Sequence, residues 1–97
     1  MTPFEQQLTI AVATLDEGEV VSYGDIAAAA GRPRAHRAAG RFLANSGLSI
    51  PWWRVVYSDG RLAECNIPRQ KELLEQEGVE FTGTRVVRAP KGRFSAK

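Results

Sequence analysis

The sequence contains a single cysteine and a single histidine among 97 residues, and this scarcity excludes several classes of protein. Cys65 alone cannot form an internal disulfide, and together with His36 it supplies too few ligands for a four-ligand zinc site. No apolar run is long enough to span a membrane, and residues 1–10 lack the basic-then-apolar order of a secretion signal. We therefore expect one small cytoplasmic domain with no cofactor, no metal and no membrane partner.

Acidic residues are absent between Ile26 and Ser58. Residues 1–31 hold five acids and no Lys or Arg, a net charge of −5, whereas residues 32–97 hold 13 basic residues against six acids, a net charge of +7. The acid-free stretch contains the arginines Arg32, Arg34, Arg37, Arg41 and Arg54. This asymmetry favours a polyanionic partner, above all nucleic acid, although a solvated basic surface would have the same composition.

Two helices are predicted by capping boxes, in which a Ser or Thr is followed three residues later by an acid. The two boxes are Thr2 with Glu5 and Ser22 with Asp25. We expect these helices to end at Gly18 and Gly31, because glycine readily adopts the backbone conformation that follows a helix. The "EVV" segment between them is predicted to be a short extended link.

A further helix is predicted from Pro33 to Asn45, which would complete a helix-turn-helix with the short helix before it. At about 100° per residue, one arc of this helix is apolar and would pack inward, and it comprises Ala35, Ala38, Ala39, Phe42 and Leu43. A separate stripe carries Arg34, Arg37 and Arg41. No acid accompanies these arginines, and a small residue, Gly40, would let a partner approach the backbone closely. We interpret this helix as the one that faces DNA.

The C-terminal part of the sequence predicts one more helix, from Pro68 to Gly78, and a small β ribbon within residues 79–87. The fold class is therefore expected to be mainly α, a winged-helix-like domain with a helix-turn-helix and a small C-terminal β ribbon. We assign residues 1–81 to this DNA-binding domain and residues 82–97 to a basic, mobile extension. Nothing in the sequence marks a dimer interface, so a monomer is expected.

The stretch "VVSYGDIAAAAGRPRAHRAAGRFLANSGLSIPWWRVVYSDGRL", followed by "LLEQEGV", resembles the DNA-binding domain of the O6-alkylguanine-DNA alkyltransferases. The resemblance runs from Phe4 to Phe81. Those proteins carry a reactive cysteine in a Pro-Cys-His-Arg-Val motif, and the matching residues here read Pro-Trp-Trp-Arg-Val, at 51–55. Tryptophan in place of the acceptor cysteine is the mark of the alkyltransferase-like proteins.

The resemblance implies a DNA-binding role for residues near the predicted helix-turn-helix. Arg37 matches an arginine that enters the base stack in place of a flipped-out nucleotide, a task suited to a planar, permanently charged guanidinium. Tyr23 matches a tyrosine that presses on the phosphate beside the target. Ala38 and Gly40 match positions of close approach to the minor groove, where bases are readily unstacked and sequence is poorly read. A solvated Arg37 and a packed Tyr23 are the alternatives without a DNA-binding role.

The same resemblance implies a pocket for the flipped base, to which we assign Pro51 and Trp52. Trp52 stands where the cysteine would be and Trp53 where a histidine would be, and we expect one tryptophan to face the pocket and the other the interior. Indole offers a flat face and an N–H donor but no nucleophile at neutral pH. A basic residue of the following loop would contact the flipped base, and Arg61 and Arg69 are the candidates.

Four residues are expected to support this pocket: Asn45, Trp53, Arg54 and Glu77. Asn45 resembles a hinge asparagine of the family, although the spacing to the Pro-Trp-Trp motif is one residue short. Arg54 is interpreted as an internal anchor that pairs with backbone carbonyls or with an acid. Glu77 matches the glutamate that stands behind the family's reactive cysteine.

The resemblance implies a sensor that is not an enzyme: it would bind O6-alkylguanine in double-stranded DNA, flip it, and mark the site for nucleotide excision repair proteins. Two alternatives remain open. One is an active alkyltransferase that uses Cys65 as its acceptor, although a reactive thiol needs an activating base or a cationic setting. The other is a sequence-specific helix-turn-helix regulator, which would be indifferent to lesions.

Overall fold

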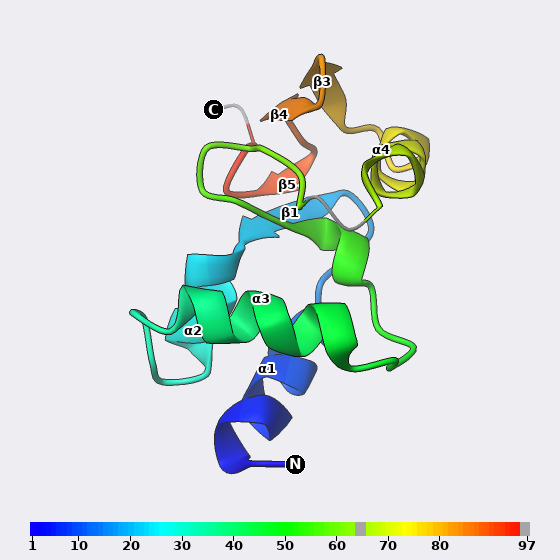
Figure 1. The fold of residues 1–97 in the computed structure, drawn as a ribbon. Coiled ribbons are helices and arrows are strands. Elements are labelled where there is room, and N and C mark those ends of the chain that lie inside the picture. Colours follow the sequence, from blue (N-terminus) through cyan, green and yellow to red (C-terminus); the bar gives the residue numbers. More distant parts are fainter. Residues whose placement is uncertain (64–65, 96–97) are drawn as a thin grey trace.

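A computed structural model describes residues 1–63 and 66–95 of the chain (Figure 1). Within these ranges the elements are α1 (Pro3–Ala13), β1 (Glu19–Ser22), α2 (Tyr23–Ala29), α3 (His36–Asn45), the 3-10 turn η1 (Trp52–Arg54), β2 (Val55–Val56), α4 (Ile67–Gln76), β3 (Glu80–Thr82), β4 (Arg85–Arg88) and β5 (Lys91–Gly92). None of these helices is both long and apolar enough to cross a membrane. Cys65 lies outside the described residues.

Both predicted capping boxes are confirmed. The Thr2 hydroxyl accepts from the Glu5 amide at 3.1 Å while the Glu5 carboxylate accepts from the Thr2 amide at 2.9 Å. Ser22 and Asp25 exchange the same pair of hydrogen bonds at 3.0 and 2.9 Å. Each box satisfies amides that the first turn of a helix leaves without an intrahelical partner, which explains why α1 and α2 begin where they do.

The predicted start of the third helix is wrong by three residues, since α3 begins at His36 and not at Pro33. The Ala35 amide donates to the Arg32 carbonyl at 2.9 Å, which closes a turn ahead of the helix. A residue before proline avoids the helical region, so the backbone at Arg32 and Pro33 favours this turn. Arg34 therefore lies outside α3, and the helix itself carries Arg37 and Arg41.

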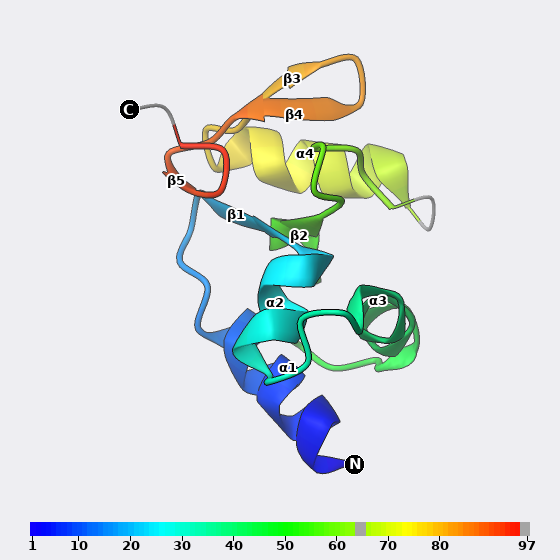
Figure 2. The same cartoon turned by 90° about the vertical axis from the view of Figure 1, so that its left-hand side faces the viewer.

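The segment predicted to be an extended link is the central strand of a sheet, β1. β1 pairs in parallel with β2, with Val21 opposite Val55, and with β5, with Val20 opposite Gly92. Helices α1, α2 and α3 gather on one side of this sheet, and α4 with the β3–β4 ribbon lies on the other (Figures 1 and 2). Sequence periodicity missed β1 because it spans only four residues.

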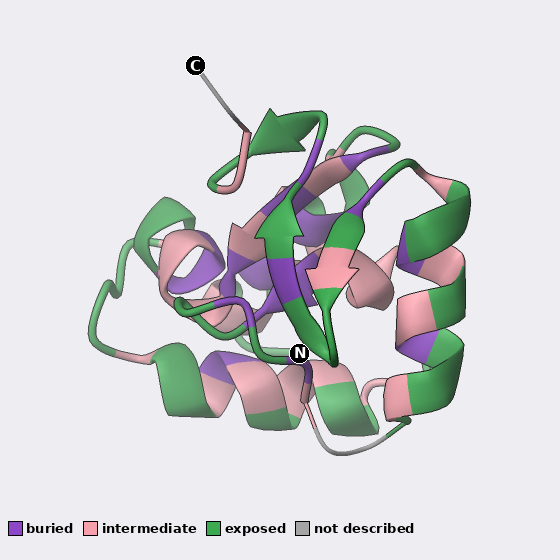
Figure 3. Cartoon of the chain, turned by 90° about the horizontal axis from the view of Figure 1, so that it is seen from above, coloured by how far each residue is buried: buried purple, intermediate pink, exposed green. Residues whose placement is uncertain are grey.

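Two hydrophobic cores follow from this arrangement, and Figure 3 shows the buried residues gathered on the inner faces of the elements. The core on the α1–α3 side comprises Leu8, Val12, Ile26, Ala27, Ala39 and Val55. The core on the α4 side comprises Val20, Val56, Leu62, Leu74, Val79, Val86 and Ala89. Because β1 and β2 supply side chains to both cores, the short sheet joins the helical half of the molecule to the α4 half.

Residues 82–95 are part of the domain, which corrects the boundary at residue 81 and the expectation of a basic extension. The predicted ribbon is present as the antiparallel pair β3–β4, and Val86 is buried in the core. The Arg93 guanidinium donates to the Asp25 carboxylate at 2.9 Å, a contact that lowers the pKa of Asp25. Lys91 pairs with Asp16 at 3.3 Å. Two of the basic residues that suggested a free tail, Lys91 and Arg93, thus pair with acids of the N-terminal segment.

One buried carboxylate fixes the orientation of the 52–54 turn. Glu77, just after α4, receives two hydrogen bonds at 2.8–2.9 Å from the Arg54 guanidinium, one from the Trp53 indole at 2.8 Å, and one from the Gly18 amide at 2.8 Å. Arg54 also donates to the Leu15 carbonyl at 2.8 Å. Arg54 and Glu77 side chains are only 14% and 8% exposed. Burial alone would raise the pKa of Glu77, but these hydrogen bonds outweigh it and hold that pKa below its ordinary value.

We expect Glu77→Gln to lower the free energy of unfolding at neutral pH by about 2–4 kcal/mol, because Arg54 would keep its charge without a counterion. The ionised carboxylate is the stabilising form, so its contribution is complete above pH 4.5, the ordinary value, and is lost as pH falls through the lower folded-state pKa. Urea unfolding at pH 7 and at a series of acidic pH values measures both effects.

Glu75→Gln is the matched control, because Glu75 is exposed on α4 and makes no side-chain hydrogen bond or ion pair within the described ranges. It should change the free energy of unfolding by no more than about 0.5 kcal/mol. An equal loss of stability in the two variants at pH 7 would mean that the Glu77 network does not stabilise the fold.

Candidate nucleic-acid interface

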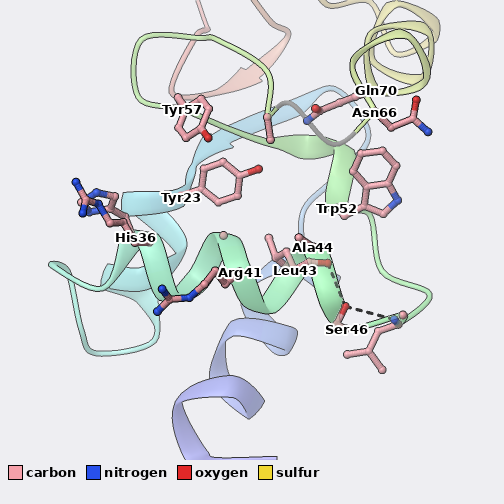
Figure 4. Close-up of a pocket in the computed structure, with 15 residues that line it drawn as sticks. Tyr23, His36, Arg41, Leu43, Ala44, Ser46, Trp52, Tyr57, Asn66 and Gln70 are labelled. Atoms are coloured by element: carbon pink, nitrogen blue, oxygen red, sulfur yellow. Dashed lines mark hydrogen bonds between the residues drawn. The ribbon is translucent and has the colours of Figure 1, made fainter.

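A cavity of about 810 Å³ lies beside α3 (Figure 4). Residues of α3 and of the turn after it form one wall, and residues of the 52–63 segment, α4 and the start of α2 form the others. The lining comprises Tyr23, His36, Arg37, Gly40, Arg41, Leu43, Ala44, Ser46, Gly47, Leu48, Trp52, Tyr57, Ala63, Asn66 and Gln70. The site is thus assembled from the start of α2, residues 36–48, the 52–63 segment and residues 66–70.

Aromatic rings face the cavity from two sides. Trp52 lies on one side, and Tyr23 and Tyr57 lie on the other (Figure 4). The centroids of the two tyrosine rings are 5.4 Å apart at a tilt of 56°, and the Arg61 guanidinium lies 5.2 Å from the centroid of Tyr57. Flat, apolar faces flanked by cations suit the binding of a planar base.

The two adjacent tryptophans have different environments. They lie in a 3-10 turn, where successive side chains diverge by about a third of a turn. The rings meet edge to face at 87°, with centroids 6.0 Å apart. Trp52 lines the cavity, whereas Trp53 packs against the α4-side core and bonds to Glu77. The 3-10 turn thus directs Trp52 to the cavity and Trp53 toward the α4-side core.

Gln70 is a buried member of the lining that sequence reasoning missed, with 2% exposure. Its Nε2 donates to the carbonyls of Trp53 and Val55 at 3.1 and 3.0 Å, so α4 is tied directly to the 52–54 turn. The position of Gln70 on its helix was the signal in the sequence that could have found it. Gln70 lies one helical turn before the buried Leu74, on the inward face of α4, where a polar residue must have a specific partner.

Positive charge is left unpaired mainly in residues 32–41, which comprise the turn before α3 and the first part of α3. Among the exposed basic residues that the structure describes, those without a carboxylate within ion-pair distance are Arg32, Arg34, Arg37, Arg41 and Arg88. Arg37 and Arg41 are exposed and have no carboxylate within ion-pair distance among the described residues. Most other exposed basic side chains do have one: Arg61 with Asp59, Arg69 with Glu72, Arg85 with Asp59, Lys91 with Asp16 and Arg93 with Asp25. Such surface pairs stabilise a fold little, yet they cancel the field of the charges involved. The wall of the cavity formed by α3 therefore keeps the field that attracts a polyanion.

Several residues predicted to contact DNA meet at the cavity: Tyr23, Arg37, Gly40, Arg41 and Trp52. Gly40 lies against Tyr23, since a Cβ atom at position 40 would be 3.7 Å from the ring. Two other predicted residues, Arg34 and Ala38, are absent from the lining. Arg34 is exposed in the turn before α3, and Ala38 is half-buried within the helix.

The structure does not bring the remaining predicted pocket residues into this cavity. Pro51 lines a separate depression next to Trp52. Arg61 and Arg69 point to acids beside them in the chain, at 2.8 and 3.3 Å, because those carboxylates are within immediate reach. Asn45 donates to the Arg41 carbonyl at 2.9 Å, so its amide bonds to its own helix and does not contact the lining.

The chain matches one family model over residues 3–79, described as the DNA-binding domain of 6-O-methylguanine DNA methyltransferase. It is 37% identical to a DNA base-flipping protein of Vibrio parahaemolyticus over 86 residues, which cover 84% of this chain and 86% of that protein. It is 34% identical to Alkyltransferase-like protein 1 of Schizosaccharomyces pombe over 90 residues, which cover 87% and 83% of the two chains.

Solved structures of the same family also match the chain. The crystal structure of S. pombe Atl1 in complex with damaged DNA containing O6-carboxymethylguanine matches with a TM-score of 0.75 and 33% identity, over 89% of this chain and 87% of that one. The Mycobacterium tuberculosis OGT in complex with DNA matches with a TM-score of 0.72 and 37% identity, over 79% of this chain and half of that one. The chain therefore belongs to the family of the 6-O-methylguanine DNA methyltransferase DNA-binding domain, and within it the chain is alkyltransferase-like.

Proposed function

We propose that this protein is a non-enzymatic sensor of O6-alkylguanine in double-stranded DNA. The observation that carries the proposal is the cavity itself, which has unpaired arginines of α3 on one wall and the Trp52 indole on another. In this proposal α2 and α3 form a helix-turn-helix, with the β3–β4 ribbon as its wing. Arg37 enters the base stack from the minor groove, and the displaced nucleotide turns into the cavity.

The energetics favour a damaged base over a normal one. Stacking of a base on an aromatic side chain contributes about 1–3 kcal/mol. Extrusion of a nucleotide costs a few kcal/mol, so the two terms nearly balance. Alkylation at O6 weakens pairing with cytosine and lowers the cost of extrusion, whereas stacking on Trp52 is unchanged. The balance therefore shifts toward the flipped state only at the lesion.

Recognition in this proposal ends without repair by the protein. Trp52 is the residue that matches the family's acceptor cysteine, and an indole does not attack an alkyl carbon at neutral pH. The bound and distorted site would instead recruit nucleotide excision repair proteins in the cytoplasm, with the sensor acting as a monomer.

The decisive experiment compares binding to one duplex with and without a single O6-methylguanine. Tighter binding to the modified duplex supports the proposal, and equal binding supports a regulator indifferent to damage.

Arg37→Ala should weaken binding to the O6-methylguanine duplex by about 10- to 100-fold, because no other side chain would stack in the gap left by the flipped nucleotide. Arg34→Ala is the matched control. It removes the same charge from the turn before α3, outside the cavity lining, and should weaken binding to damaged and undamaged duplexes equally. Fluorescence anisotropy titrations measure both variants. Loss of the same factor in the two variants would remove the intercalating arginine from the mechanism.

Salt should weaken binding steeply, because phosphate contacts release counterions. Arg41→Ala should reduce the slope of log affinity against log salt by about 1 if Arg41 contacts one phosphate. Lys91→Ala also removes one positive charge, but Lys91 is paired with Asp16, so the slope should stay that of the unmodified protein. A slope that changes equally in both variants would contradict a DNA-binding surface centred on α3.

The mass of the protein should not change after incubation with DNA that contains O6-methylguanine, since none of the described residues that line the cavity is a cysteine. Intact-protein mass spectrometry measures this directly, and a cysteine-containing alkyltransferase under the same conditions is the positive control. A gain of one methyl group, lost again in Cys65→Ser, would establish the alternative in which Cys65 is the acceptor.

A further inference from the structure

The amide of Gln70 is held in one orientation at the wall of the cavity. Both Gln70 hydrogen bonds are made by Nε2, which donates to the carbonyls of Trp53 and Val55 at 3.1 and 3.0 Å. Because a carbonyl cannot bond to another carbonyl, exchange of the amide nitrogen and oxygen would replace two hydrogen bonds by two repulsive contacts. The side chain is 2% exposed, so it has little freedom to turn away.

The other end of this amide is an acceptor without a partner. Gln70 Oε1 accepts no hydrogen bond from any described residue, and no side-chain oxygen or nitrogen within the described ranges is both fully buried and unbonded. Oε1 therefore reaches accessible space, and the accessible space next to Gln70 is the cavity (Figure 4). Gln70 Oε1 is therefore a fixed acceptor in a cavity that is also lined by aromatic rings, and it can accept a hydrogen bond from one donor of a bound molecule.

The neighbouring polar side chains are less suited to this role. The Ser46 hydroxyl donates to the Leu43 carbonyl and accepts from the Leu48 amide, both at 3.4 Å. Asn66 is exposed, and its side-chain oxygen accepts from the Arg69 amide at the start of α4. Gln70 is thus the buried, oriented polar group of the lining.

We infer that Gln70 is a specificity-determining residue, whose Oε1 accepts a hydrogen bond from the exocyclic 2-amino group of the flipped purine. This inference rests on the proposed function. Alkylation at O6 leaves N1 of guanine without its proton, so the 2-amino group is the remaining donor on the pairing edge of the damaged base. Trp52 would then bind the face of the base, and Gln70 would select bases that carry this amine. A base without the 2-amino group would leave Oε1 buried with no donor. A buried polar group left unpaired discriminates against a base more strongly than the loss of an apolar contact does.

The test compares two duplexes that differ only in the 2-amino group, one with O6-methylguanine and one with O6-methylhypoxanthine. Affinities are measured for the unmodified protein and for Gln70→Met, which keeps the length of the side chain and lacks the acceptor. The ratio of the two affinities should fall by about five- to tenfold in the variant. Differences in stability between the two duplexes cancel when the affinity ratios of the two proteins are compared, because both proteins bind the same two duplexes. An unchanged ratio would overturn the inference.

Gln76→Met, at the exposed end of the same helix, is the control and should leave the ratio unchanged. If Gln70→Met does not fold, the unmodified protein still decides the question. Each base is then placed opposite an abasic site, so that pairing no longer contributes, and O6-methylguanine should bind about five- to tenfold more tightly. Equal affinity there would overturn the role of Gln70. Equal binding of O6-methylguanine and guanine duplexes would instead contradict the proposed function itself.

Discussion

The geometry of the cavity depends on one carboxylate, that of Glu77. It accepts hydrogen bonds from Arg54, Trp53 and the Gly18 amide, and so joins the end of α4, the 52–54 turn and the segment before β1. Because Trp53 is held by this network, Trp52 is turned the other way, toward the cavity. Gln70 strengthens the same junction from α4. An anchor of charged and polar groups thus presents one indole at the cavity wall and packs the adjacent, half-buried indole against the α4-side core.

The distribution of charge has a second consequence for function. The acidic N-terminal segment and the basic C-terminal segment meet in space, and Lys91 and Arg93 are neutralised by Asp16 and Asp25. No acid lies between Ile26 and Ser58, so α3 has no acidic neighbour in sequence to do the same. The unpaired positive charge is therefore concentrated in residues 32–41, of which Arg37 and Arg41 lie beside the cavity. The overall charge of +2 conceals this concentration.

Local signals in the sequence predicted the local structure. The capping boxes at Thr2 and Ser22 depend on residues three apart, so a short window of sequence predicts both. Strand β1 was missed because its stability comes from partners at positions 55–56 and 91–92, which no short window includes. Residues 82–95 were assigned to a free extension for the same reason, since Lys91 and Arg93 pair with acids that lie 75 and 68 positions away.

The candidate site was predicted only in part. Tyr23, Arg37, Gly40, Arg41 and Trp52 do line one cavity. Helical spacing had indicated Arg41, and the resemblance to a family the other four. Arg61 and Arg69 do not, because each finds a carboxylate two or three residues away. Gln70 went unnoticed because its importance lies in two backbone carbonyls of a distant turn. Side-chain types and spacing indicate which chemistry is present, but partners from other elements decide where each side chain points.

The central claim is that a damaged base stacks on Trp52, and tryptophan emission tests it most directly. In Trp53→Phe the indole of Trp52 is the single remaining tryptophan, because the chain has two, and Glu77 still accepts hydrogen bonds from Arg54 and from the Gly18 amide that hold the 52–54 turn. Titration with a duplex that contains O6-methylguanine should quench this emission, whereas an undamaged duplex, bound to the same extent, should not. Emission that stays unchanged when the damaged duplex is fully bound would contradict the account.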